Sequence, residues 1–177
     1  MHLRLESYVS PIGEILLVTD DDGALRALDF VDYETRMHRL LADHYGDYEL
    51  LSSAAPKSII QALDAYFAGE FTALEDILTA TGGSLFQRAV WNALRNIAPC
   101  TTKSYGQIAA EIGRPQASRA VGAANGANPI AIVLPCHRVI GANGTLTGYG
   151  GGLPRKQWLL DHERRLAGLH SQRLLEV

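Results

Sequence analysis

The sequence predicts an α+β protein: a small antiparallel sheet with helices, followed by a mainly helical half that contains a helix-turn-helix. Three observations predict this class: strand-like alternation in the first thirty residues, helical periodicity over most of the remainder, and a charge imbalance between the halves. The 177 residues are 47% hydrophobic and 20% charged, which is typical of globular proteins and excludes disordered and fibrous ones. A chain of this length can bury a substantial core.

Two turns divide the first thirty residues into three short strands. The turns lie at 10–13 and 20–23 and contain proline, glycine and aspartate, with β-prone residues on either side. Strands joined by short turns pair as antiparallel neighbours, so we expect a three-stranded meander. Two helices should follow, because apolar residues recur at helical spacing over 37–44 and 59–67.

A small polar stretch at 79–84 (TATGGS) marks the expected boundary between an acidic α/β scaffold domain, 1–83, and a basic helical domain, 84–177. The overall net charge is −3. Residues 1–85 hold five Lys and Arg against fifteen Asp and Glu, a net charge of −10, whereas residues 86–177 hold eleven against four, a net charge of +7. This asymmetry predicts that the basic half binds an anionic partner.

Short helices separated by glycine and proline are expected in the basic half. Ser84 and Ser104 are suited to cap the helices that begin after them. Residues 113–115 (GRP) end the second helix, and another is expected over 116–125, so the pair fits a helix-turn-helix. The spacing alone also fits an ordinary helical hairpin. A glycine-rich loop over 141–152 and a last helix over 153–166 complete the chain.

The second helix of this pair carries almost only small side chains. Arg119 is its one long polar residue between 117 and 125, whereas a helix that reads base edges in the major groove needs several. The composition therefore favours close approach to the DNA backbone and the minor groove, with weak sequence preference. Arg119 could fill the place of an extruded base, or could instead contact a phosphate or form a surface ion pair.

Cys136 lies in the segment PCHRV, 135–139, and is the strongest candidate nucleophile. A thiol with an ordinary pKa of about 8.5 is only slightly ionised at neutral pH, so it needs a base or a cation nearby. His137 could act as that base through a water molecule if an acceptor orients it. The candidate acceptors in the basic half are Glu111, Asp161, Glu163 and Glu176. Glu163 is favoured because it lies near the apolar face of the last helix, and Cys100 is interpreted as a buried bystander.

No metal, cofactor or membrane segment is expected. The two cysteines form no CxxC pair and lack spaced histidines, which excludes a zinc site and favours reduced thiols. The first residues have no apolar core of the signal-peptide type, and no apolar run is long enough to span a membrane. These features predict a cytoplasmic protein.

PCHRV and the motifs around it strongly resemble the 6-O-alkylguanine-DNA alkyltransferase family over residues 84–166. The other matching motifs are RAVG at 119–122, NP at 128–129, GY at 148–149 and KxWLLxHE at 156–163. The acidic half resembles the constitutive bacterial form, including TATGG at 79–83. The resemblance implies a ribonuclease H-like N-terminal domain and DNA repair by transfer of the alkyl group from 6-O-alkylguanine, or 4-O-methylthymine, in duplex DNA to the protein. It also implies nucleotide flipping, a monomer without cofactor, and clustering of molecules along DNA.

The resemblance assigns a role to each candidate residue. Cys136 matches the nucleophile that accepts the alkyl group, with His137 and Glu163 in a water-linked relay. Asn128 matches a residue that braces the site, Tyr105 one that crowds the flipped nucleotide and donates a hydrogen bond to the base, and Arg119 the finger that replaces it in the stack. The other expected DNA contacts are Ser104, Gln116, Ala117, Ser118, Ala120, Gly122, Ala123, Asn125 and Arg138. The expected base pocket is Asn125, Val139, Tyr149, Gly150, Gly151 and Lys156.

The expected chemistry consumes the protein. Donors such as the Tyr105 hydroxyl and the Gly150 N–H would stabilise the guanine anion as it leaves. The thioether formed on Cys136 has no good leaving group, so each molecule should act once. The sequence differs from relatives in the family at Ala131, Thr147 and Asn125. These differences could change the tolerance for larger alkyl groups, in a direction that the sequence leaves open.

Three other functions compete with this hypothesis. A non-catalytic protein that only binds alkylated DNA is opposed by Cys136. A transcription regulator is disfavoured by the small residues of the second helix. A cysteine-histidine hydrolase would leave the helix-turn-helix unexplained. Lesion preference, clustering on DNA and the role of the acidic half are left open by the sequence.

Overall fold

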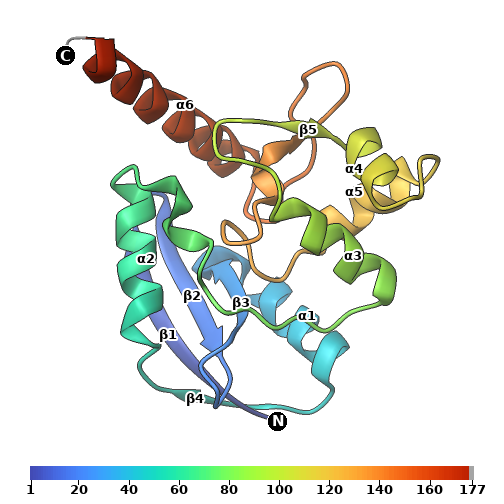
Figure 1. Ribbon diagram of the computed structural model, residues 1–177. Coiled ribbons are helices and arrows are strands. Elements are labelled where there is room, and N and C mark those ends of the chain that lie inside the picture. Colours follow the sequence, from blue (N-terminus) through green and yellow to red (C-terminus); the bar gives the residue numbers. More distant parts are fainter. Residues whose placement is uncertain (176–177) are drawn as a thin grey trace.

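The computed structural model describes residues 1–175 as a small mixed sheet with helices, followed by a mainly helical half (Figure 1). Strands β1 (His2–Ser10), β2 (Gly13–Thr19) and β3 (Leu25–Phe30) form the predicted antiparallel meander. A purely antiparallel sheet was the wrong expectation, because β4 (Glu49–Ser52) pairs parallel to β1 and gives the order β3-β2-β1-β4. This edge strand is short and mostly exposed, so it carries no alternating pattern.

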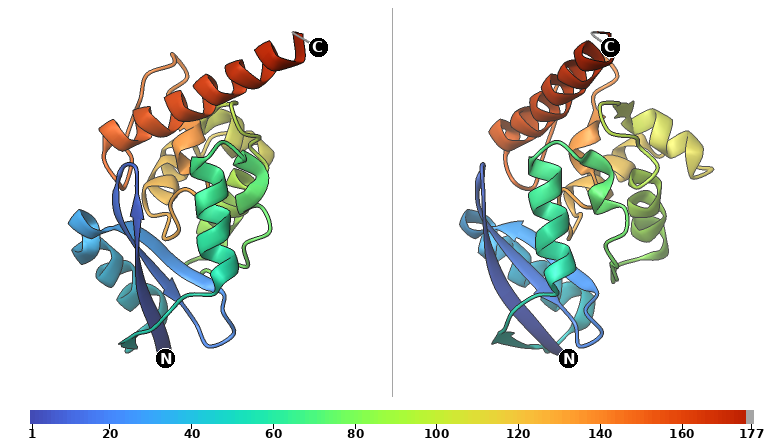
Figure 2. Two further views of the ribbon diagram at one scale, coloured as in Figure 1. Left: turned by 90° about the vertical axis from the view of Figure 1, so that its left-hand side faces the viewer. Right: turned by 60° about the vertical axis from the view of Figure 1, so that its left-hand side comes forward.

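Helices α1 (Glu34–Tyr45) and α2 (Lys57–Phe67) cover opposite faces of the sheet (Figure 2). Alternate residues of β2 therefore enter two different cores: Leu16 packs on the α1 side, and Leu17 belongs to the larger core that includes α2 and the C-terminal half. Because both faces are covered, residues 15–19 are buried without interruption. The 3-10 turns η1 (Val31–Tyr33) and η2 (Phe71–Leu74) follow β3 and α2.

The C-terminal half contains α3 (Leu85–Leu94), α4 (Tyr105–Glu111), α5 (Ser118–Gly126) and α6 (Leu153–Leu175). Both predicted serine caps are confirmed: Ser84 and Ser104 each form a capping box with the glutamine three residues later. Helix α5 begins two residues later than expected, and α6 extends nine residues beyond the expected end. Strands β5 (Lys103–Ser104) and β6 (Val139–Ile140) form a short parallel pair.

One buried segment, residues 128–139, joins the two halves. It lies along the edge strand β3, where the Leu28 N–H donates to the Pro129 carbonyl at 2.9 Å and the Ala131 N–H donates to the Leu28 carbonyl at 3.2 Å. The larger hydrophobic core also includes side chains from both halves. The division into domains at residue 84 stays a prediction, because the packed interior crosses that point.

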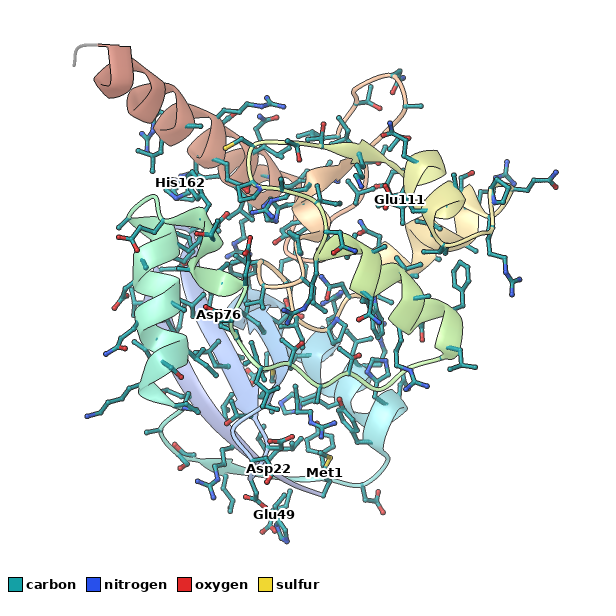
Figure 3. All side chains as sticks on the ribbon, viewed as in Figure 1. Met1, Asp22, Glu49, Asp76, Glu111 and His162 are labelled. Carbon is teal, nitrogen blue, oxygen red and sulfur yellow. The ribbon has the colours of Figure 1, made fainter. Side chains whose placement is uncertain are left out.

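Helix α6 packs on the end of α2 through an aromatic cluster centred on His162, which Figure 3 labels at this junction. The imidazole stacks on Trp158 with ring centroids 4.6 Å apart, and its Nε2 lies 3.2 Å from the Tyr66 carbonyl oxygen. These contacts fix the first turns of α6, which carry Lys156 and Glu163, against the N-terminal half. No helix in the described part of the chain has the length and apolar character needed to cross a membrane.

Candidate functional site

Cys136 begins the 3-10 turn η3 (Cys136–Arg138) at the end of the buried segment that joins the two halves. Its side chain is in the interior, at 3% exposure. Asn128 fixes the backbone that leads to it: the Asn128 Nδ2 donates to the Leu134 carbonyl at 2.8 Å, and its Oδ1 accepts from the Ile130 N–H at 2.9 Å. The side chain of Asn128 therefore holds the backbone that leads into this turn.

The environment of the thiol favours its protonated form. Burial raises the pKa of Cys136, and this outweighs the opposite influence of the Asn128 hydrogen bond and of the Arg36 and Lys156 charges. A buried thiol of this kind is a poor nucleophile until a base removes its proton. The three groups that favour the thiolate nevertheless surround the position where negative charge would form.

His137 is fully buried and is oriented by Glu163 of α6. The Nε2 atom of His137 lies 3.1 Å from Oε2 of Glu163. Burial raises the pKa of Glu163, but its contacts with His137 and Arg138 outweigh burial and hold the pKa below its ordinary value. Burial lowers the pKa of His137, despite the opposing influence of the carboxylate. The pair is therefore a neutral imidazole beside an ionised carboxylate.

The protonation states decide which nitrogen of His137 can accept a proton. An ionised carboxylate only accepts hydrogen bonds, so Nε2 carries the hydrogen that points to Glu163. In a neutral imidazole the other nitrogen, Nδ1, is then the acceptor. This Nδ1 atom is buried and has no hydrogen-bond partner among the described residues. His137 thus presents an unoccupied basic nitrogen next to the cysteine in the chain.

Arg138 does not lie where a DNA contact requires it. Its side chain is only 6% exposed, its Nε donates to Oε1 of Glu163 at 2.7 Å, and a terminal nitrogen donates to the Ile97 carbonyl at 2.9 Å. The expectation that Arg138 binds DNA is corrected by this geometry. A buried carboxylate needs a cation beside it, and Arg138 supplies that charge.

The expected pocket residues converge on the glycine-rich loop. Lys156 is fully buried and its Nζ donates to the carbonyls of Val139, Thr147 and Gly148 at 2.6, 2.7 and 3.3 Å. Burial lowers its pKa to about 8, with the opposite influence of Cys136 smaller. The lysine therefore ties the loop to the strand that follows the cysteine.

Two glycines of the loop lie close to side chains of the N-terminal half. A Cβ added at Gly150 would lie 2.7 Å from the guanidinium of Arg36, and one at Gly151 would lie 2.6 Å from the ring of Phe30. The hydroxyl of the neighbouring Tyr149 is buried and has no partner among the described side chains, and burial raises its pKa well above its ordinary value. This phenol is therefore neutral and able to donate a hydrogen bond.

Helices α4 and α5 pack on each other and present a surface of small side chains. Arg119 is exposed on α5 and forms no ion pair within the part of the chain that the structure describes. Tyr105 is the first residue of α4, and its hydroxyl lies 2.7 Å from Oγ1 of Thr147. Exposed residues among the predicted contacts are Gln116, Ser118, Arg119, Ala120 and Ala123, and half-buried ones are Ser104, Ala117 and Gly122.

Asn125 faces the interior. Its side chain is 3% exposed, and Nδ2 lies 3.4 Å from the Cys136 carbonyl oxygen. This burial contradicts a direct DNA contact by the Asn125 side chain, whereas its position beside the cysteine is compatible with a place in the expected pocket.

The expectation that Cys100 is buried is also wrong. Cys100 is exposed, in a turn where its φ is +65°. Its thiol donates to the backbone carbonyl of Glu163 at 3.2 Å. Glu176, another carboxylate considered for the relay, lies outside the described residues.

Arg36 of α1 is a site residue that the sequence did not indicate. Its guanidinium is held by Asp29 at 2.7 Å and donates to the carbonyls of Gly126 and Asn128 at 2.6 and 3.1 Å. It therefore links the acidic half to the end of α5 and to the residue that braces the cysteine. Within the described chain, no three His, Cys, Asp or Glu side chains form a group that could hold a metal ion.

Both halves match models of protein families. Residues 3–80 match the model described as 6-O-methylguanine DNA methyltransferase, ribonuclease-like domain, and residues 85–165 match the one described as 6-O-methylguanine DNA methyltransferase, DNA binding domain.

Individual relatives agree with these matches. The chain is 52% identical over 166 residues to the methylated-DNA--protein-cysteine methyltransferase of Salmonella typhimurium, covering 92% of this chain and 96% of that protein. It is 64% identical over 156 residues to the Mycolicibacterium paratuberculosis protein of the same name, covering 88% and 89%. The crystal structure of Mycobacterium tuberculosis OGT in complex with DNA superimposes with a TM-score of 0.77 at 43% identity, covering 94% of each chain.

Proposed function

Because the chain belongs to the 6-O-methylguanine DNA methyltransferase family, we propose that it transfers the alkyl group of 6-O-alkylguanine, and of 4-O-methylthymine, in duplex DNA to its own Cys136. As a member of this family, the protein is a methyltransferase that acts in DNA repair. One observation supports transfer to Cys136 in particular. The buried thiol is followed in the chain by His137, a neutral histidine whose Nε2 is held by the Glu163 carboxylate.

The relay prepares the thiol for attack. The proton of Cys136 passes through one water molecule to Nδ1 of His137, and the Glu163 carboxylate stabilises the imidazolium that results. Arg138 keeps the carboxylate ionised throughout. The base is available at neutral pH because burial keeps His137 unprotonated beforehand.

The displacement then proceeds in line at the alkyl carbon. The sulfur–carbon bond forms as the bond from carbon to the guanine oxygen breaks, and guanine leaves as an anion. The Tyr105 hydroxyl and the Gly150 N–H donate to the base where this charge develops. The proton held by His137 returns to the guanine, so the products are neutral guanine and a thioether on Cys136. The thioether has no good leaving group, which limits each molecule to one reaction.

The protein binds the minor groove of DNA as a monomer, and helices α4 and α5 form the helix-turn-helix that makes this contact. Their exposed face carries small side chains that permit close contact with the sugar-phosphate backbone. Acidic residues of the N-terminal half lie far from this face: Figure 3 labels Asp22 and Glu49 at the end of the sheet near Met1, away from α4 and α5. This arrangement supports a binding mode in which the negative half faces away from the duplex.

Arg119→Ala should slow repair of duplex DNA by about tenfold or more, because extruding a base without a replacement in the stack costs a few kcal/mol. Reaction with the free base 6-O-methylguanine should change less than twofold, since no nucleotide is flipped. Single-turnover rates on both substrates measure the difference. The matched control is Arg164→Ala, which removes an exposed arginine from α6. Equal losses on duplex and free base would contradict the role of the finger.

The rate of alkyl transfer should stay nearly constant between about pH 7 and pH 8 and should fall in more acidic buffers. The sign follows from two shifts: burial raises the pKa of Cys136, so the thiol stays protonated until the relay removes its proton, and burial lowers the pKa of His137, so acid protonates this base only below its ordinary range. Single-turnover rates on a methylated duplex, across buffers of constant ionic strength, give the profile. A rate that rises about tenfold per unit from pH 7 to pH 8 would mean that hydroxide and not His137 forms the thiolate, and would contradict the relay.

Intact mass spectrometry tests the proposed function. The protein is incubated with a duplex that contains one 6-O-methylguanine, and we expect a gain of one methyl group per chain that peptide mapping assigns to Cys136. Saturation at one group, even with excess DNA, tests single turnover. A reduced protein that binds the duplex but gains no mass would instead be a non-catalytic damage-binding protein.

A further inference from the structure

The hydroxyl of Tyr105 has one partner among the described residues, and that partner is Thr147. The phenol oxygen lies 2.7 Å from Oγ1 of Thr147, where either hydroxyl can be the donor, and the phenol donates a longer hydrogen bond of 3.4 Å to the Thr147 carbonyl oxygen. The two residues come from different elements, the first turn of α4 and the glycine-rich loop. Their contact therefore links the first of the predicted DNA-binding helices to the glycine-rich loop.

Thr147 is held firmly although its side chain is exposed. Lys156, which is fully buried, donates to the Thr147 carbonyl at 2.7 Å and to the Val139 carbonyl at 2.6 Å. Val139 follows η3 directly, so the lysine fixes Thr147 relative to the turn that carries Cys136. The loop thus presents the threonine hydroxyl at a defined place.

The direction of this hydrogen bond determines what Tyr105 can do. If the phenol donates to Thr147, its only hydrogen is used and cannot reach a base. If the Thr147 hydroxyl donates to the phenol oxygen, the phenol hydrogen has only the 3.4 Å contact with the Thr147 carbonyl to exchange for a hydrogen bond to the base. A donated hydrogen bond also strengthens the phenol as a donor, because linked hydrogen bonds polarise one another. The second arrangement is the one that the reaction can use.

We propose that Thr147 is a positioning residue, whose hydroxyl donates to Tyr105 and thereby turns the phenol hydrogen toward the departing guanine. This inference rests on the proposed function, in which Tyr105 donates to the base. Thr147 itself does not touch the reacting atoms, and its effect passes entirely through Tyr105. The two substitutions Thr147→Val and Tyr105→Phe should therefore depend on each other.

A double-mutant cycle tests this dependence with single-turnover rates on a 6-O-methylguanine duplex. Thr147→Val keeps the shape of the side chain and should slow transfer about fivefold, as expected for loss of one hydrogen bond. Thr147→Ser keeps the hydroxyl and should stay within twofold of the unmodified protein. In the Tyr105→Phe background, Thr147→Val should change the rate less than twofold. Affinity for an unmodified duplex should be the same for Thr147→Val, Thr147→Ser and the unmodified protein.

Three outcomes would overturn the inference. Equal slowing by Thr147→Val in both backgrounds would mean that the threonine acts through the shape of the loop. A Thr147→Ser protein as slow as Thr147→Val would assign the effect to the methyl group. A Thr147→Val protein that reacts as fast as the unmodified one, or faster, would mean that the contact does not help Tyr105. If the unmodified protein gains no methyl group, the proposed function itself fails, and the inference fails with it.

Discussion

Cys136→Ser protein should gain no measurable methyl group from a 6-O-methylguanine duplex, a loss on the order of 10³-fold or more in rate. An alcohol holds its proton far more tightly than a thiol, and the buried site already disfavours the charged form of the side chain. His137 cannot compensate, because burial lowers its own pKa. Intact mass after a long incubation measures the loss, and fluorescence anisotropy should show unchanged affinity for the duplex.

The chain supplies a matched control for this substitution. Cys100→Ser removes the other thiol, which is exposed and donates only to the backbone of Glu163. This variant should react at close to the normal rate and gain one methyl group. Methylation of Cys136→Ser, or failure of Cys100→Ser with its fold intact, would contradict the assignment of the nucleophile.

Glu163→Gln should have the second largest effect, on stability and on rate together. Arg138 would lose its only carboxylate partner among the described residues while remaining 6% exposed. Removal of one member of a buried ion pair costs about 3–5 kcal/mol. The amide would also stabilise an imidazolium less well, so alkyl transfer should slow by about 100-fold, within the usual range for general base catalysis.

Urea unfolding and single-turnover transfer at neutral pH separate the two effects. Glu163→Asp is the matched control, because it keeps the charge on a shorter side chain and should recover part of the stability. Arg138→Met with Glu163→Gln removes both charges, and should be more stable than Glu163→Gln alone. If the single variant is as stable as the unmodified protein, the buried network is not a major source of stability.

Much of the fold was predictable because its signals are local. Ser84 and Ser104 form their capping boxes with residues three positions away, and the meander depends on turns within the first thirty residues. The strand β4 was missed because its pairing partner lies far back in the chain and its own four residues are mostly exposed. The length of α6 was underestimated because Gly168, two residues after the expected end, does not interrupt the helix.

The site was predictable to the extent that its chemistry lies in one short segment. The cysteine and the histidine are adjacent in the chain, and Nε2 of His137 lies 3.1 Å from Oε2 of Glu163, the acceptor that the sequence favoured. Arg138 was misassigned because a cation in a basic half resembles a DNA contact, and its real partner is distant in sequence. The place of Arg36 in the site could not be predicted from the sequence. It lies among other charged residues on α1, and its contacts with Gly126 and Asn128 are distant in sequence.

The buried segment 128–139 also determines what unfolds together. Its backbone completes the edge of the sheet, and its last residues include Cys136. The segment belongs to the basic half in sequence but pairs with the sheet of the acidic half, so loss of order in either half breaks hydrogen bonds of the other. We therefore expect the two halves to unfold together, and the acidic half to stabilise the segment that carries the proposed alkyl acceptor.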